Sequence, residues 1–394
     1  MQKIHGETGA AGGRRMNSDF HYYGTYCAAI IAGYAHEEAL EIGYSAQLVD
    51  HCTRTWLKKI DGPESAATTQ LQSELISART DPAGLQDITR IWSSFHFLPR
   101  DLYAPVPKGS RRYKDKYRLI CGPNGDLLKK TIQIAEKRNT LQAAGIAMHV
   151  LADTWAHTYF AGTPSLVINN TDYNFFELKK EHGHLRRVPI VFGHNPAAKE
   201  DPQTGAYTGS LYQANENSIM NLGHGRAGHL PDYSFIRYAY APSWDRYDEI
   251  IKDNPRDYMH AFAQMVYALK LLHEESDAFE TDTYAWEEIR PYAGRIRGIL
   301  EERRTDDSED WKAFGEELSA EPIPAFSLEP FELEFLSASF NVQKLLASAP
   351  GRFFTAAIDQ KAMLVNETAR SGSQLAGRAQ EITGLADLYK EGRV

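Results

Sequence analysis

The chain has 394 residues, of which 42% are hydrophobic and 24% charged, a composition typical of a globular protein and unlike that of a disordered chain. Its 43 Lys and Arg against 52 Asp and Glu give a net charge of −9, which argues against a protein that coats duplex nucleic acid with a broad basic face. Three widely spaced cysteines exclude a disulfide framework and a thiolate zinc ribbon.

The first 15 residues are Gly-rich and basic, and their lack of periodicity predicts a disordered leader. From Phe20 onward, apolar residues recur at helical spacing. A second helix is predicted over 36–52, where acidic residues at its start complement the helix dipole. The aromatic segment 88–101 comes next and is broken by a proline, and 101–125 is predicted to be a loop.

The strongest helical pattern covers residues 126–160, which form two predicted helices. Asn139 and Thr140 are suitable N-cap residues for the second of these helices. Residues 161–230 are rich in Gly, Asn and Pro, with short β-like pieces such as RVPIVF. We therefore predict a long irregular insertion there.

Helical patterns return at 255–274, and two more follow at about 282–302 and 307–319. The fold class predicted from these patterns is all-α, a multi-helix bundle. We expect a helical metal-binding domain over 16–320 and a C-terminal helical extension over 321–394, which follows a Pro-containing linker.

A helix in the middle of the chain carries the motif that points to chemistry. His149, Asp153 and His157 are spaced four residues apart on an otherwise apolar segment, so their side chains project from one stripe. Burial of three such groups without partners would cost several kcal/mol, whereas imidazole and carboxylate are ligands that suit zinc. The spacing predicts metal ligands, and the alternative is a set of buried, hydrogen-bonded core residues.

One helix cannot complete a metal centre, and the chain concentrates eleven of its 14 histidines between His21 and His229. Further candidate ligands lie on other predicted segments: Asp19, His21, Asp50, His96, His224, His229 and Asp232. Each of these alone would more often be an ordinary helix or loop residue, and their order along the chain is what connects them.

This order resembles that of the zinc-dependent phospholipase C and single-strand nuclease superfamily. An early helix histidine is followed by an aspartate, a histidine in an aromatic segment, an H-x3-D pair, another histidine, and a last histidine with an acidic partner. The segments DFHYYGTYCAA and GIAMHVLADTWAHTYFAG are also similar to an uncharacterised bacterial family within that superfamily. The resemblance covers about residues 16 to 275 and implies a helical hydrolase of phosphoester bonds in a phospholipid or a nucleic acid.

The resemblance also implies two or three zinc ions and a role for each candidate. One zinc would be held by His149, Asp153, Asp50 and His96. A second would be held by His157 with His224 or His229, and with Asp232. The third would be held by His21, with Asp153 as a bridge, and Asp19 would replace the N-terminal ligand of the phospholipases. Asp50 would orient or deprotonate the attacking water.

Other readings stay open at this stage. Arg226 could contact a phosphate or be an exposed loop residue, and Trp155 could line a substrate cleft or pack around the metals. The metals could also be structural, in a non-catalytic scaffold or binding protein. No stretch is long and apolar enough for stable membrane insertion, so we expect a cytoplasmic protein, or one exported without a cleavable signal.

Overall fold

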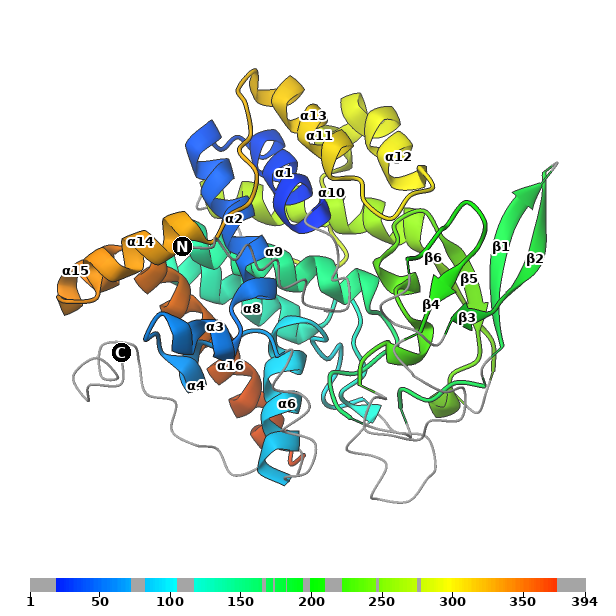
Figure 1. The fold of residues 1–394 in the computed structure, drawn as a ribbon, viewed down its shortest axis with the longest axis horizontal. Coiled ribbons are helices and arrows are strands. Elements are labelled where there is room, and N and C mark those ends of the chain that lie inside the picture. Colours follow the sequence, from blue (N-terminus) through cyan, green and yellow to red (C-terminus); the bar gives the residue numbers. More distant parts are fainter. Residues whose placement is uncertain are drawn as a thin grey trace, which may run out of the picture.

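A computed structural model gives the fold (Figure 1). The residues that it describes are 19–71, 82–104, 117–164, 168–172, 174–181, 183–193, 199–209, 222–245, 248–274 and 278–373. The leader predicted for residues 1–15 lies outside these ranges.

The centre of the fold is helix α9 (Leu141–Ala156), which is buried along almost its whole length. It is apolar on most sides, as expected of a helix with no solvent face. Thr140 accepts a hydrogen bond from the backbone N–H of Ala143, which confirms it as the N-cap, while Asn139 ends the preceding helix in the left-handed conformation. Helices α2 (His36–His51) and α10 (Asn254–Glu274) pack directly against α9.

The other helices surround this centre or extend from it (Figure 1). The α-helices are α1 (Thr25–Ile31), α3 (Arg54–Lys59), α4 (Glu64–Ala67), α6 (Pro82–Phe95), α8 (Asp126–Arg138), α11 (Trp286–Ile289), α12 (Ala293–Glu301), α13 (Ser308–Ser319), α14 (Glu329–Ala338), α15 (Val342–Ala347) and α16 (Ala349–Arg370). Short helices of other types are η1 (Asp19–Gly24), a π-helix, and the 3-10 helices η2 (Gly225–Ala227), η3 (Leu230–Asp232), η4 (Ser243–Asp245) and η5 (Arg290–Tyr292). The helices predicted over 126–138, 255–274 and 307–319 are confirmed within one residue at each end.

A β-sheet covers one side of the helical core. Its four antiparallel strands are arranged in the order β2-β1-β5-β6. They are β1 (Phe175–Glu181), β2 (His184–Ile190), β5 (Arg237–Tyr240) and β6 (Ile250–Asp253). Two further strands, β3 (Phe192–Gly193) and β4 (Tyr207–Thr208), form a parallel pair. The inner face of the larger sheet forms a second apolar cluster, in which Phe175 stacks on Tyr240.

The all-α prediction is therefore wrong, since the fold is mixed α and β. The segment predicted as an irregular insertion over 161–230 contains β1 to β4, and its RVPIVF piece lies largely in β2. Two causes explain the error. Strands β5 and β6 have only four residues each, too few to show a clear period, and β1 pairs with β5 across about 60 residues of chain.

The C-terminal extension is packed onto the same hydrophobic core as the helices before it. Phe353 and Phe354 of α16 belong to the main apolar cluster, and α16 lies against α6, α8 and α9. Pro350 is in the first turn of α16, a position that tolerates proline. Among the described helices, none combines the length and the apolar character that a membrane span requires.

Candidate metal centre

The stripe predicted on α9 forms the base of a buried polar cluster. His149 and Asp153 are fully buried, and His157 follows as the C-cap residue of the helix. The His149 Nε2 atom lies 3.2 Å from Asp153 Oδ2, and His157 Nδ1 lies 3.7 Å from the same oxygen. One helix thus places two imidazoles beside one carboxylate oxygen.

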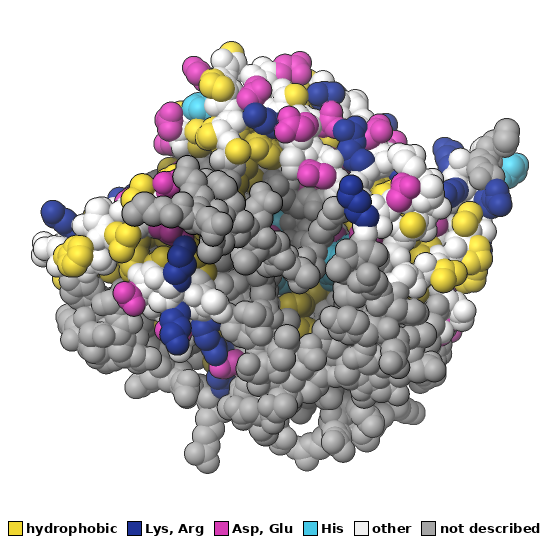
Figure 2. Space-filling view, in the orientation of Figure 1, with side chains coloured by type: hydrophobic (Ala, Val, Ile, Leu, Met, Phe, Trp, Pro, Cys, Tyr) yellow, Lys and Arg dark blue, Asp and Glu magenta, His cyan; other side chains and the backbone are white. Residues whose placement is uncertain are grey.

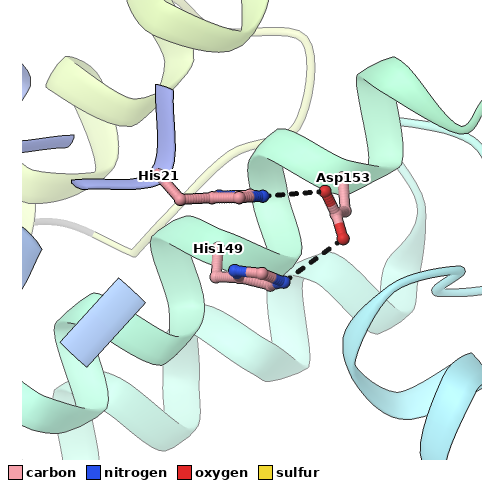
Figure 3. Close-up of side chains that lie close together, drawn as sticks. All are labelled: His21, His149 and Asp153. Atoms are coloured by element: carbon pink, nitrogen blue, oxygen red, sulfur yellow. Dashed lines mark ion pairs between the residues drawn. The ribbon is translucent and has the colours of Figure 1, made fainter. Parts of the chain in front are cut away.

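Asp153 is the centre of the cluster because its two oxygens face different partners. Oδ1 lies 3.2 Å from His21 Nε2, whereas Oδ2 lies 3.1 Å from His96 Nδ1 and close to His149. Figure 3 shows the rings of His21 and His149 directed at the two oxygens. A carboxylate with this arrangement can bridge two cations.

The π-helix η1 places His21 in the cluster. Such wide helical turns are rare and are found mostly at functional sites. The His21 ring stacks on that of His149 with centroids 3.8 Å apart and an interplanar angle of 20°. Within the described part of the chain, Nδ1 of the fully buried His21 ring has no hydrogen-bond partner, and Nε2 faces the Asp153 Oδ1 atom at 3.2 Å. A buried imidazole with an unsatisfied nitrogen calls for an explanation, and a bound ligand is one.

A glycine lets α2 approach α9 at the level of the cluster. A Cβ atom on Gly145 would lie 2.4 Å from the carbonyl oxygen of Ile42 and 2.9 Å from the backbone nitrogen of Ala46. Gly145 is one helical turn before His149, so the same close approach brings the Ala46 carbonyl to 2.9 Å from His149 Nδ1. The sequence of α9 thus determines which face of α2 reaches His149.

His96 joins the cluster from the end of α6. Its Nε2 atom lies 3.1 Å from the carbonyl oxygen of Thr69, and its Nδ1 atom faces His149 Nε2 at 3.2 Å. Asp50, in the last turn of α2, is buried, and its Oδ1 atom lies 3.9 Å from His96 Nδ1. Residues distant in sequence therefore meet at one point, as the predicted order requires.

Four histidines of the cluster share one hydrogen-bonding pattern. One ring nitrogen of each lies within 3.1 Å of a backbone carbonyl oxygen. The accepting carbonyl belongs to Thr69 for His96, Ala46 for His149, His96 for His157 and Gly228 for His224. A carbonyl oxygen can only accept, so that nitrogen carries the proton and the other nitrogen of a neutral ring is left with a lone pair. Metal-binding histidines are oriented in this way.

The lone pairs left by this hydrogen-bonding pattern matter most where His96, His149 and Asp153 meet. His96 Nδ1, His149 Nε2 and Asp153 Oδ2 lie 3.1 to 3.2 Å from one another, and with neutral rings all three atoms are acceptors. Three acceptors this close repel one another unless a cation or a proton lies between them. The ligand atoms of a tetrahedral zinc site are about 3.3 Å apart, given zinc bonds of about 2.0 Å.

A second group of ligands is built on the turns of η2 and η3. His157 Nε2 lies 3.2 Å from Asp232 Oδ1, and His224 Nε2 lies 3.5 Å from the same oxygen. The side chain of His224 is 18% exposed, whereas His149 and Asp153 are fully buried. Figure 2 shows histidine side chains in a hollow near the middle of the face in view. This half of the cluster is the accessible one.

Gly228 makes the turn of this second group possible. Its φ of +55° is in the range that favours glycine, and a Cβ atom there would lie 2.2 Å from the carbonyl oxygen of Thr208. Its own carbonyl oxygen lies 2.7 Å from His224 Nδ1. The glycine in GHGRAGHLPD therefore fixes the orientation of the neighbouring ligand.

The charged groups of the cluster strongly shift one another's pKa values. Burial alone would lower the pKa of His157, but the Asp153 and Asp232 carboxylates outweigh it and raise this pKa to about 9. Burial and the charge of His21 lower the pKa of His149 to about 4. Burial opposes ionisation of Asp153, yet the surrounding histidines hold its pKa well below the usual range. At neutral pH the carboxylate is ionised and requires positive charge beside it.

The described part of the chain thus contains three sets of largely buried His and Asp side chains that could hold a metal ion. These are His21 with His149 and Asp153, Asp50 with His96 and His149, and His157 with His224 and Asp232. Eight of the residues predicted from the sequence therefore lie together. The sets are not independent, because His149 belongs to two of them and has only Nε2 to offer.

Two predicted ligands lie beside these sets. His229 Nδ1 lies 3.3 Å from Asp232 Oδ2, so His229 contacts a ligand without belonging to a set. Asp19 accepts hydrogen bonds from the backbone N–H groups of Phe20 and Asp307 and borders a small cavity together with Asp232. The sequence left His224 and His229 as alternatives for one ligand of the second ion. In the structure His224, rather than His229, faces the cluster.

The structure also describes the surroundings of the two residues predicted to bind substrate, Arg226 and Trp155. Arg226 lies in η2 and is only 4% exposed, so it is not the exposed loop residue that was the alternative. Trp155 donates a hydrogen bond from Nε1 to Gln264 of α10 and packs against His260. These contacts favour a packing role for Trp155.

Sequence reasoning did not find the groups that orient the ligands. The carbonyls of Ala46 and Thr69 belong to the backbone, which carries no residue-specific signal, and Thr69 lies in a stretch with no clear pattern. Phe97 stacks on His157 with ring centroids 4.6 Å apart, and its position directly after His96 was the one available hint.

Comparisons with known proteins place the chain in a family. The sequence model of a family of unknown function (DUF6765) matches residues 16–368, which is most of the chain. The chain belongs to this family. No curated protein and no solved structure matches it.

Proposed function

We propose that this protein is a hydrolase of phosphoester bonds that uses bound zinc ions. The observation that carries the proposal is the meeting of His96 Nδ1, His149 Nε2 and Asp153 Oδ2 at 3.1 to 3.2 Å, with the other nitrogen of each ring hydrogen-bonded to a backbone carbonyl. Nitrogen and carboxylate oxygen donors without thiolates fit zinc.

The two halves of the cluster suit different roles. The buried half offers four candidate ligands, namely Asp50, His96, His149 and Asp153, and structural zinc sites have four protein ligands. The accessible half offers three, His157, His224 and Asp232, and catalytic sites have three protein ligands and one open position. We place the reaction at the accessible half. A third ion would lie between His21 and Asp153.

Zinc held there would supply positive charge for a phosphoryl oxygen and would lower the pKa of a bound water toward neutrality. The chain's own residues prepare this site. Asp153 and Asp232 supply negative charge on both sides of His157, and Gly228 fixes the ring of His224. Asp50 lies beside His96 in the buried half, which favours a ligand role for it over the proton-accepting role that the resemblance implied.

The resemblance to zinc-dependent phospholipases C and single-strand nucleases supports the choice of phosphoester bonds. Eight residues in the order of that superfamily lie in one cluster here. A phospholipid and a nucleic acid remain the two candidate substrate classes.

A non-catalytic, metal-stabilised scaffold is the second candidate. The specific observation in its favour is the closed character of the buried half, where Asp50, His96 and His149 form one buried set and Asp153 Oδ2 lies 3.1 Å from His96 Nδ1. This candidate predicts metal binding without hydrolysis.

The test is metal analysis followed by hydrolysis of bis(4-nitrophenyl) phosphate. We expect two or three zinc ions per chain and hydrolysis that is lost on chelation and restored by zinc. His224→Ala should abolish hydrolysis, whereas His260→Ala is the matched control, because His260 lies on α10 outside the three sets. A zinc-loaded protein inert toward phosphodiesters and phosphomonoesters would favour the scaffold, and a metal-free protein would contradict both candidates.

A further inference from the structure

Two buried polar side chains on the C-terminal helix α16 have no role in the centre described above. Gln360 and Lys361 are 1% and 5% exposed. Burial of a polar side chain, and of an ammonium group above all, is costly unless hydrogen bonds compensate it. Both side chains find their partners in the segments that carry His96 and its hydrogen-bond acceptor.

Gln360 contacts the end of the helix that precedes His96. Its Nε2 atom donates to the carbonyl oxygen of Ser94 at 2.9 Å and to Thr131 Oγ1 at 3.0 Å. Ser94 is in the last turn of α6, where carbonyl groups have no partner within the helix. His96 follows two residues later, so this hydrogen bond fixes the backbone from which the His96 side chain extends.

Lys361 holds the segment on the other side of the His96 ring. Its Nζ atom donates to the carbonyl oxygens of Ser65 at 2.9 Å and Thr68 at 3.4 Å. The next carbonyl, that of Thr69, accepts the Nε2 proton of His96. The hydroxyl of Thr69 donates to the carbonyl oxygen of Val49 at 2.6 Å, directly before Asp50.

We infer that Gln360 and Lys361 are positioning residues of the metal centre, which hold His96 with its Nδ1 lone pair toward His149 and Asp153. The C-terminal helix is then part of the site, although it supplies no ligand. The inference rests on the metal centre proposed above but not on the reaction. Outer partners of this kind typically contribute about 10- to 100-fold to metal affinity.

The variants Gln360→Met and Lys361→Met remove the donors at similar side-chain length. The matched control is Lys130→Met, because Lys130 of α8 pairs with Glu367 of α16 at 2.7 Å and touches neither the Ser94 nor the Thr68 segment. A general loosening of α16 would affect all three variants alike.

The experiment is titration of each metal-free protein with cobalt(II), followed by its visible absorption spectrum. For the buried ion we expect an affinity at least tenfold lower and an altered spectrum in both Gln360→Met and Lys361→Met. Lys130→Met should match the wild type. If Lys361→Met does not fold, Gln360→Met decides alone.

Wild-type affinity and spectrum in the Gln360 and Lys361 variants would overturn the inference. So would equal losses in all three variants, because α16 would then act only through overall stability. A wild-type protein that binds no cobalt would contradict the metal centre itself and this inference with it, and absence of hydrolysis by a cobalt-loaded protein would contradict only the proposed reaction.

Discussion

The two halves of the candidate metal centre are built by different means. The buried half combines side chains from α9, α2 and the end of α6, and its His149 and Asp153 side chains are inaccessible to solvent. The accessible half depends on two short turns, in which the side chains of His224 and His229 are 18% and 15% exposed. Rigid helices suit a site that holds its ion, whereas turns at the surface suit a site that exchanges water and substrate.

Asp153 connects the two halves, so its loss should have the largest effect. Asp153→Asn removes the charge that faces His21, His96 and His149 and that raises the pKa of His157. Loss of one partner from a buried pair costs about 3 to 5 kcal/mol, which is on the order of a hundredfold or more in affinity.

Zinc titration of Asp153→Asn checks this expectation, and Asp126→Asn, at the exposed start of α8, is the control. The account requires that the Asp153 variant lose affinity both for the buried ion and for the ion proposed between His21 and Asp153. If only one of these two ions is affected, Asp153 is not a bridge.

The close approach of α2 and α9 positions side chains of the buried half and not those of the accessible half. In Gly145→Ala the new Cβ atom meets backbone atoms of α2, so the helices must separate and the Ala46 carbonyl must move away from His149. We expect a loss of about 1 to 3 kcal/mol in the free energy of unfolding, as is typical of overpacking.

Urea denaturation of the metal-free proteins measures this loss. Gly298→Ala is the matched control, because Gly298 is also within a helix and has open space around its Cβ position. That variant should be neutral or more stable, since alanine favours the helix by about 1 kcal/mol. Equal stability of Gly145→Ala and the wild type would show that α2 has room to move.

The two halves should also differ in the pH dependence of metal binding. In the metal-free protein the pKa of His157 is about 9, so a metal must displace its proton at neutral pH, whereas the pKa of His149 is about 4. The affinity of the accessible half should therefore rise by about tenfold per pH unit from pH 6.5 toward 9, and the contribution of His149 should not change there.

Cobalt titrations at pH 6.5, 7.5 and 8.5 separate these behaviours. The same raised pKa means that protonated His157 stabilises the metal-free protein fully below about pH 6.5, and that this contribution is lost as the pH rises through about 9. A pH-independent affinity at the accessible half would argue that His157 is not a ligand.

The smallest effect is expected at His229, which contacts Asp232 without belonging to a set of candidate ligands. His229→Ala should lower the zinc affinity of the accessible half by about tenfold, the low end of the range for an outer partner. His224→Ala should remove that ion altogether. Equal effects of the two substitutions would make His229 a ligand.

The candidate ligands on the central helix could be predicted from the sequence, whereas the other parts of the site and of the fold could be predicted only in part. The H-x3-D-x3-H spacing is set by the helix period, so His149, Asp153 and His157 could be assigned to one stripe from the sequence. The order of His21, Asp50 and His96 along the chain suggested that they join it. The sheet was not predicted, because β5 and β6 have only four residues each and β1 pairs with β5 across about 60 residues of chain.

The choice between His224 and His229 also required the structure. Both lie in one Gly-rich segment, and the backbone conformation at Gly228 decides which ring faces Asp232 Oδ1 and His157. The same holds for Gln360 and Lys361, whose partners are backbone carbonyls about 270 to 300 residues away in the sequence.

The most direct test of the central claim is crystallographic. Diffraction data collected on either side of the zinc absorption edge locate zinc without assumptions about its ligands. The account predicts one anomalous peak at about 2.0 to 2.2 Å from His149 Nε2 and a second at the same distance from His157 Nε2 and Asp232. If crystals grown with zinc show no anomalous peak at either position, the claim of a zinc site there is contradicted.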